Sequence, residues 1–180
     1  MRLTELVHQH LHGLLKPGDL AIDATVGNGH DTVFLAQRIG ATGHVHGFDI
    51  QHDALLHARQ HLDKEAPGAN VELHLAGHET MDRHLPGAMA ASTAAIVFNL
   101  GYLPGADKSV TTRASTTLAA LQLAWGTYLR PGGVLSVLCY PGHPGGQKEA
   151  DAVEQWLADL GAKVTTTRSA GPVLHLVTVE

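Results

Sequence analysis

The sequence predicts an α/β fold in which a doubly wound, mostly parallel sheet ends in an antiparallel hairpin. Short apolar runs alternate with helix-like segments along most of the chain, which is typical of parallel strands joined by helical crossovers. The last two apolar runs, 164–168 and 173–179, are separated only by Ser-Ala-Gly-Pro, so they predict a hairpin. No linker, repeat or low-complexity segment interrupts the chain, and we expect residues 1–180 to form a single domain.

The strands are predicted from short apolar runs bounded by turn residues. The run 20–25 is largely apolar, as a centrally buried strand should be. The run Ala-Ala-Ile-Val-Phe-Asn-Leu at 94–100 is a similarly clear strand. In chain order, the seven strands are expected at 20–25, 44–50, 71–75, 94–100, 134–139, 164–168 and 173–179.

The helices are predicted from apolar residues at helical spacing. Leucine and valine recur with that spacing over 3–15, so this segment is expected to be an amphipathic helix. Glycine and proline then mark the ends of elements, as at Pro67-Gly68 and Pro86-Gly87. In chain order, helices are expected at 3–15, 31–39, 53–65, 111–129 and 148–160, with a weak helical piece at 80–85.

Composition excludes several classes of protein. The formal net charge of −5 argues against a protein that coats nucleic acid non-specifically, although it allows an enzyme that grips one structured RNA through a local patch. Cys139 is the one cysteine, so no intrachain disulfide can form and a reducing compartment is expected. The N-terminus lacks an apolar signal core and no run is long enough to span a membrane, so we expect a cytoplasmic protein.

A glycine-rich turn follows the first predicted strand and suits an adenosine-containing ligand. It has the form Gly27-x-Gly29-x-x-Thr32 and opens the next predicted helix. Asp49 ends the second strand, where a carboxylate can bind both ribose hydroxyls of either NAD or S-adenosylmethionine (SAM). The missing third glycine and the terminal hairpin favour SAM. Asp23, in the first strand, is expected to approach the cationic amino-acid end of that donor.

Four blocks carry a resemblance to a known family. They are Asp-Ala-Thr-Val-Gly-Asn-Gly-His-Asp-Thr at 23–32, Gly-Phe-Asp-Ile-Gln at 47–51, Asn-Leu-Gly-Tyr-Leu-Pro-Gly-Ala-Asp-Lys-Ser at 99–109 and Tyr-Pro-Gly-His-Pro-Gly-Gly at 140–146. With these blocks, nearly the whole chain resembles a bacterial family of class I SAM-dependent methyltransferases labelled as rRNA methylases. Members are linked to the tRNA wobble uridine, where they methylate the aminomethyl group of 5-aminomethyl-2-thiouridine.

The resemblance implies a Rossmann-like class I methyltransferase fold, with a seven-stranded sheet covered by helices on both faces. It also implies bound SAM, a tRNA substrate gripped at its anticodon stem-loop, and a homodimer. By position, Asn28 and His30 are expected to face the methionine part of the donor, with Gln51 near the ribose. Gly77 and His78 are expected to border the adenine.

The acceptor side is predicted at the ends of the fourth and fifth strands, where ligand sites form in such sheets. Asn99 ends the fourth strand and is expected to orient the substrate amine, with Tyr102 stacking on the base or capping the methyl pocket. After the fifth strand, Tyr140 is expected to contact the substrate, and His143 is a candidate base with a suitable ordinary pKa. Asp107 and Lys108 are either substrate contacts or solvated loop charges.

Metal and RNA sites are less clearly indicated. The pairs His8/His12 and His57/His61 have a spacing that can chelate zinc, but neither has a second paired ligand in the sequence, so no metal is expected. The basic residues are spread thinly. Those that can form an RNA-facing rim are Arg2, Lys16, Lys108, Arg113 and Lys148.

Two other functions stay open on the sequence alone. The donor can serve another RNA or a small-molecule acceptor, and the acidic net charge and the lack of an added RNA-binding domain favour the small molecule. A nicotinamide-dependent enzyme or a non-catalytic nucleotide-binding module is the more remote alternative, because the glycine turn and the carboxylate of Asp49 also suit NAD.

Overall fold

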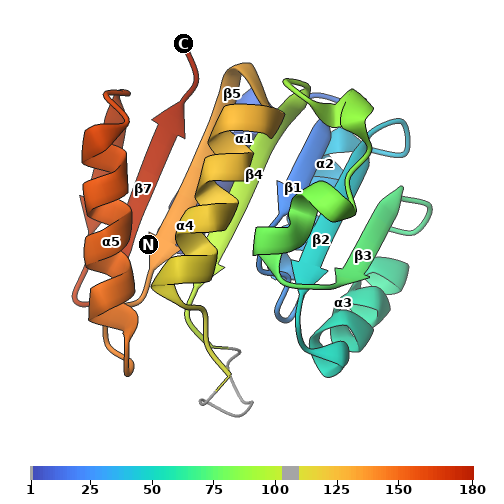
Figure 1. Cartoon of the computed structure of the whole chain (residues 1–180). Coiled ribbons are helices and arrows are strands. Elements are labelled where there is room, and N and C mark those ends of the chain that lie inside the picture. The colour runs from blue at the N-terminus through green and yellow to red at the C-terminus, as the bar shows by residue number, and fades with distance from the viewer. Residues whose placement is uncertain (1, 103–109) are drawn as a thin grey trace.

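A seven-stranded sheet between two layers of helices makes up the residues that the structure describes (Figure 1). The structure is a computed structural model, and it describes residues 2–102 and 110–180. The strand order is β3-β2-β1-β4-β5-β7-β6. The first five strands of that order are parallel, whereas β7 runs antiparallel to both β5 and β6. The predicted fold, including its terminal antiparallel hairpin, is therefore confirmed.

The element bounds agree closely with the predicted ones. The strands are β1 Leu20–Asp23, β2 His44–Asp49, β3 Val71–Leu75, β4 Thr93–Leu100, β5 Leu129–Cys139, β6 Val164–Arg168 and β7 Val173–Thr178. The α-helices are α1 Leu3–Leu14, α2 His30–Ile39, α3 His52–Glu65, α4 Ala114–Leu123 and α5 Gly146–Asp159. In the described part of the chain, none of the helices combines the length and the apolar character that crossing a membrane requires.

Three predicted elements were wrong in extent. The helix expected at 111–129 is the shorter α4, followed by the π-helical turn η3, Ala124–Tyr128. The chain leaves η3 directly into β5, which begins at Leu129 rather than at 134 because Leu129 pairs with Thr93 of β4, before a register shift after which Val134 pairs with Ala95. The piece expected at 80–85 is a 3₁₀ helix, η1, His78–Arg83, and a second short 3₁₀ turn, η2, spans Gly87–Met89.

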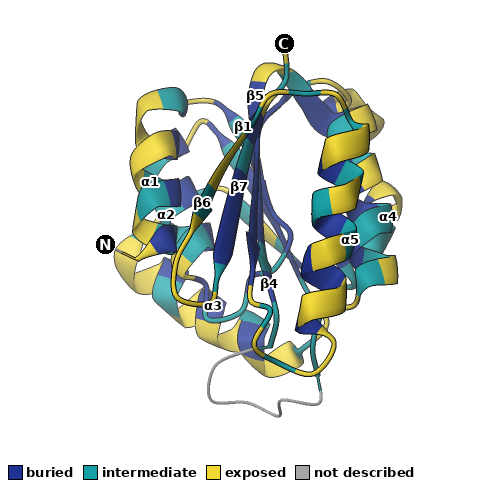
Figure 2. Ribbon diagram, turned by 90° about the vertical axis from the view of Figure 1, so that its left-hand side faces the viewer, coloured by how far each residue is buried: buried dark blue, intermediate teal, exposed yellow. Residues whose placement is uncertain are grey.

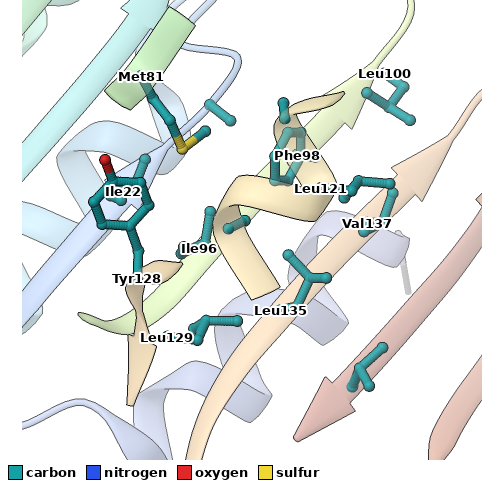
Figure 3. Close-up of a cluster of buried hydrophobic side chains, with 14 of the residues drawn as sticks. Ile22, Met81, Ile96, Phe98, Leu100, Leu121, Tyr128, Leu129, Leu135 and Val137 are labelled. Carbon is teal, nitrogen blue, oxygen red and sulfur yellow. The ribbon is translucent and has the colours of Figure 1, made fainter. Parts of the chain in front are cut away.

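The two faces of the sheet bury separate apolar clusters, and each is covered by its own helices. Figure 2 shows α1, α2 and α3 on one side of the sheet and α4 and α5 on the other. Alternate residues of a strand point to opposite faces, so Ala21 packs under α1 and α2 while its neighbour Ile22 faces α4. Figure 3 shows the larger cluster, in which Phe98 lies beside Leu121 of α4.

The strand order reverses beside β1, which places a ligand site there. β2 and β4 both pair with β1 in parallel, so the loops that follow these three strands emerge at the same edge of the sheet. Ligands of open α/β sheets bind at the carboxyl ends of the strands, where the order reverses. The glycine turn after β1, Asp49 at the end of β2 and Asn99 near the end of β4 all lie at this edge.

Candidate functional site

The glycine turn between β1 and α2 needs its glycines for conformation and for space. Gly27 and Gly29 have φ angles of 51° and 80°, which L-residues with a side chain rarely adopt. A Cβ on Gly29 would also lie 2.7 Å from the Cα of Ala58 in α3. The turn therefore packs directly against α3, and α2 begins at His30 with its N-terminus at the edge of the sheet.

Asp23 supports this turn from inside the protein. Its carboxylate is fully buried and accepts hydrogen bonds from the Thr32 hydroxyl at 2.6 Å and from the Thr25 backbone N–H at 3.1 Å. Burial, and then the neighbouring carboxylate of Asp31, raise the pKa of Asp23 to about 7. Its carboxylate is held by the fold and is not among the groups that line the cavity.

Asp49 joins the glycine turn to the start of α3. One carboxylate oxygen accepts the Gly27 backbone N–H at 2.8 Å, and the other accepts the Gln51 backbone N–H at 2.9 Å. Each oxygen keeps a second lone pair for a ligand hydroxyl. Asp49 lines the cavity, so those lone pairs are available at the position where a ribose would bind.

The turn and the loops after β4 and β5 enclose one cavity of about 1390 Å³. That volume exceeds the roughly 300–1,000 Å³ of a typical small-molecule site, so it has room for two ligands side by side. We call its two walls the turn side and the loop side. Predicted residues on the turn side are Gly27, Asn28, His30, Asp49, Gln51, Gly77 and His78. Predicted residues on the loop side are Asn99, Tyr102, Tyr140 and His143.

Two predicted donor-binding residues, Asp23 in β1 and Gly29 in the turn itself, do not line the cavity. Asp107 and Lys108 lie outside the described residues, as does much of the 99–109 block. Among the basic residues predicted for an RNA-facing rim, Arg2 and Arg113 line the cavity, whereas Lys16 and Lys148 do not.

His78 is more deeply buried than its predicted place beside an adenine requires. Its Nδ1 lies 3.0 Å from the backbone oxygen of Ala24, and its ring meets Phe98 edge to face. Burial lowers the pKa of His78, so the ring is neutral and donates from Nδ1 to that carbonyl. Its Nε2 is buried and has no hydrogen-bond partner in the described part of the chain. A neutral ring with an unsatisfied acceptor on the cavity wall fits a ligand that donates a hydrogen bond, such as an adenine amino group.

Asp31 connects the two walls, although sequence reasoning assigned it no role. One of its carboxylate oxygens accepts the side-chain amide of Asn99. The other lies 2.5 Å from Nε2 of His8, whose ring stacks on Phe34 with centroids 4.0 Å apart. Both Asp31 and His8 line the cavity. The signal for Asp31 was its place in the 23–32 block, but no sequence signal pairs His8 of α1 with α2.

The loop side is fixed to α5 through a second buried carboxylate that the sequence did not reveal. Glu149 is 2% exposed and accepts hydrogen bonds from the hydroxyls of Thr112 and Thr117 at 2.7 and 2.6 Å. Thr112 in turn accepts the Gly101 backbone N–H at 2.8 Å. This chain of bonds holds the backbone next to Tyr102 in place.

The aromatic residues of the loop side lie close together. The rings of Tyr102 and His143 meet edge to face at 5.9 Å, and Tyr102 bridges to Thr111 through its backbone. His143 Nδ1 lies 3.1 Å from the backbone oxygen of Pro144, while its Nε2 is buried with no hydrogen-bond partner among residues 2–102 and 110–180. Burial, and then the carboxylate of Asp31, raise the pKa of Tyr140, so this phenol stays protonated.

Comparison with known proteins places the chain in a family. Residues 45–172 match the family model described as "Putative rRNA methylase". The chain is 39% identical over 168 residues to a tRNA (mnm(5)s(2)U34)-methyltransferase, chloroplastic, of Arabidopsis thaliana. That match covers 88% of this chain and 60% of the plant protein, so the chain spans well under two thirds of that relative's length.

Solved structures give the same family and the same fold. A protein from Clostridium thermocellum described as a "putative rRNA-methylase" is 34% identical, with a TM-score of 0.89, and the match covers 97% of this chain and 96% of that one. A protein from Streptococcus mutans described as a "putative methyltransferase", solved in complex with SAH, is 35% identical, with a TM-score of 0.85 and coverage of 99% and 98%. The chain therefore belongs to the family described as "Putative rRNA methylase", whose members have the class I methyltransferase fold.

Proposed function

We propose that this protein is a SAM-dependent methyltransferase that N-methylates the aminomethyl group of 5-aminomethyl-2-thiouridine at the tRNA wobble position. The observation that carries the proposal is the single cavity that joins the glycine turn and Asp49 to Asn99. The plant relative, named as a tRNA (mnm(5)s(2)U34)-methyltransferase, supports the substrate, and the SAH complex of the Streptococcus mutans relative supports the donor.

The turn side fits the donor in shape and in hydrogen bonding. Asp49 has unused lone pairs for two ribose hydroxyls, and Gln51 lies beside it. The buried Nε2 of His78 fits an adenine amino group, and Asn28 and His30 line the wall where the methionine part would lie. Asp23 acts indirectly in this proposal, because its carboxylate is engaged with Thr32 and Thr25. When bound, SAM supplies an electrophilic methyl group on a positively charged sulfur.

The loop side orients the substrate amine. Asn99 donates its side-chain N–H to Asp31, which leaves its side-chain oxygen to accept a hydrogen bond from the amine. That bond points the nitrogen lone pair at the methyl group, at the separation of about 3–3.5 Å that displacement requires. The nitrogen lone pair would form the new N–C bond as the S–C bond breaks. The electron pair of the S–C bond would stay on the departing sulfur. Tyr102 and Tyr140 are placed to stack on the base or to close the methyl pocket.

The proton of the amine must leave, because an alkylamine is mostly protonated at neutral pH and an ammonium has no lone pair. His143 is the base that we propose. By donating from Nδ1 to the Pro144 carbonyl, it keeps the lone pair on Nε2. The Asp31–His8 pair is the alternative acceptor, since its carboxylate already contacts Asn99. The reaction itself calls for no metal, because the sulfonium is already activated.

The decisive test of substrate uses purified protein with SAM and tRNA from a strain that lacks the gene. We expect mass spectrometry of that tRNA to show the unmethylated aminomethyl nucleoside, and the protein to convert it to the methylated form in vitro. The free nucleoside and small amines are the control acceptors. Methylation of a small molecule with no activity on the tRNA would replace this proposal with a small-molecule methyltransferase, and unchanged tRNA modification in the strain would reject the proposal.

The donor is tested separately by calorimetric titration with SAM and with NAD. We expect SAM to bind and NAD to give no saturable heat. The reverse result would assign the cavity to a nicotinamide-dependent enzyme, because the glycine turn and Asp49 alone suit either cofactor.

The proposal also includes a cytoplasmic homodimer in which residues 1–180 of each chain form a single catalytic domain. A dimer would double the basic residues at the cavity mouth, where Arg2 and Arg113 lie, and so help an acidic protein to hold an anticodon stem-loop. Light scattering of the purified protein measures the dimer directly. A monomer at working concentration that is active on tRNA would remove the dimer from the proposal.

A further inference from the structure

A cluster of histidines lies at the opposite end of β2 from the cavity. His44 and His46 alternate along β2, so both point to the same face of the sheet, and their rings stack with centroids 4.2 Å apart. Glu72 of the edge strand β3 is the register partner of His46 and points to this face as well. His44 and Asp49 stand at the two ends of β2, about 16 Å apart at 3.3 Å per residue.

We propose that His44, His46 and Glu72 bind a divalent transition-metal ion, with zinc the best fit, that ties β2 to β3. The three side chains each offer one ligand atom within 4.8 Å of the others. Two imidazoles and one carboxylate, with water as a fourth ligand, form a donor set that zinc binds in proteins. Softer or harder ions fit less well, because the set has no thiolate and only one carboxylate.

The distances lie close to those that a metal needs. Glu72 Oε2 is 4.0 Å from Nε2 of His44 and 3.8 Å from Nδ1 of His46. Ligand atoms of a tetrahedral zinc site lie about 3.4 Å apart, as follows from bonds of about 2.0–2.2 Å. The Glu72 side chain is 58% exposed, so it is free to rotate inward, and the ion has a route from solvent.

One ring nitrogen of the cluster, Nε2 of His44, is buried and has no hydrogen-bond partner among the described residues, which is costly for a polar atom unless something binds it. Nδ1 of the same ring lies 3.2 Å from the side-chain nitrogen of Asn70. Zinc binding at Nε2 requires the Asn70 amide to turn, so that its oxygen accepts the Nδ1 proton and the lone pair of Nε2 faces the metal.

The nitrogen of His46 that faces Glu72 is Nδ1, and the same atom lies 3.0 Å from Nε2 of His74. Zinc bound at Nδ1 would therefore replace the hydrogen bond between the two imidazoles. The side chain of His46 is 3% exposed, so packing holds its ring in place at the cluster.

Titration of the full-length protein with ZnCl₂, followed by calorimetry, tests the proposal, with Co²⁺ absorption as a second readout of ligand geometry. We expect one saturable site per chain and a raised Tm in the presence of zinc. Glu72→Gln and His44→Gln should each raise the Kd for zinc on the order of 100-fold. Both positions are partly exposed, and circular dichroism checks that each variant folds.

The control is a double variant, His57→Gln with His61→Gln. These residues form the helix-spaced pair on α3 that could bind zinc adventitiously. The proposal expects this variant to keep the site at full affinity. It is overturned if no saturable site exists, if Glu72→Gln and His44→Gln bind zinc as tightly as the wild type, or if only the α3 double variant loses binding.

Discussion

The turn side of the cavity is built mostly from residues that are close together in the sequence, whereas the loop side is assembled from segments that are far apart in the sequence. Gly27, Asn28 and His30 belong to one turn, and Asp49 fastens that turn to the next β–α unit through two backbone hydrogen bonds. Asn99 instead depends on a carboxylate 68 residues away, and the Gly101 backbone depends on Glu149 of α5. We therefore expect the turn side to be damaged mainly by mutations within the turn or at Asp49. The loop side should also be damaged by mutations at residues far away in the sequence, such as Asp31 and Glu149.

The difference predicts separate effects on donor binding and on turnover. Asp49→Ala should have the largest effect, because it removes the carboxylate that holds the turn and would hold two ribose hydroxyls. Hydrogen bonds to charged groups contribute about 1.5–3 kcal/mol each. We expect the Kd for SAM to rise on the order of 1000-fold, measured by calorimetry.

The matched control for that variant is Asp53→Ala. Asp53 lies in the first turn of α3, close to Asp49 in sequence, but its side chain is 87% exposed. Its SAM affinity should equal that of the wild type. Equal affinities for both variants would mean that Asp49 does not hold the donor.

Asn99→Ala should reduce turnover while leaving SAM binding intact. The variant loses the oxygen that orients the amine, and a misplaced reacting group costs on the order of 100-fold in rate. Single-turnover kinetics on tRNA would measure the loss, and SAM titration of the same protein is the internal control. A fully active variant would put the methyl pocket elsewhere in the cavity.

Glu149→Gln should reduce turnover by roughly tenfold without any contact to either ligand. Its carboxylate serves two threonine hydroxyls, and an amide offers only one acceptor oxygen, so one of those hydroxyls loses a bond of about 1 kcal/mol. Glu154→Gln, on the same helix but at the surface, is the control and should be neutral. If both variants turn over tRNA at the wild-type rate, the loop side does not depend on α5.

Asp23→Asn should have the smallest effect, on the pH dependence of stability. Asp23 binds its proton more tightly in the folded chain, with a pKa of about 7, than at the ordinary value of 3.8. Its contribution to stability is therefore complete below pH 3.8 and is lost as the pH rises through about 7. Between pH 6 and 8 the free energy of unfolding of the wild type should fall by about 1 kcal/mol, whereas that of the variant should not change for this reason.

Thermal melts at pH 6 and pH 8 measure this loss as a shift of about 2–4 °C in Tm. An asparagine can keep both hydrogen bonds, since its oxygen accepts the Thr25 N–H and its amide donates to the Thr32 hydroxyl. If Tm changes by the same amount between pH 6 and pH 8 in both proteins, Asp23 does not titrate in this range.

The sequence predicted the sheet well because its signals are local. Strands β3 and β6 lie where the apolar runs placed them, and the short connection between β6 and β7 correctly predicted a hairpin. The helix at 111–129 was overextended because its composition stays helix-like through Tyr128, whereas pairing with β4 draws Leu129 into β5. That pairing is with Thr93, 36 residues earlier in the chain, and no local pattern encodes it.

The site was predicted where residues follow strands, and missed where contacts cross the fold. Asp49 and Asn99 were found from their places at strand ends, and both line the cavity. His8 and Glu149 went unnoticed because α1 and α5 meet the site only in three dimensions. The local metal signals in the sequence are the helix-spaced histidines, whereas the strand spacing of His44 and His46 brings them to Glu72 only once β2 and β3 pair. The zinc proposal therefore departs from the sequence-based expectation of no metal.

The order of strands at the end of the sheet also constrains how the protein is made. β6 precedes β7 in the chain, yet among the described strands it pairs only with β7, which lies between it and β5. As the polypeptide leaves the ribosome, β6 therefore emerges before its partner exists, while β5 keeps an open edge. The sheet is completed only when β7 is synthesised and pairs with both, so this edge stays open to wrong partners until β7 has emerged.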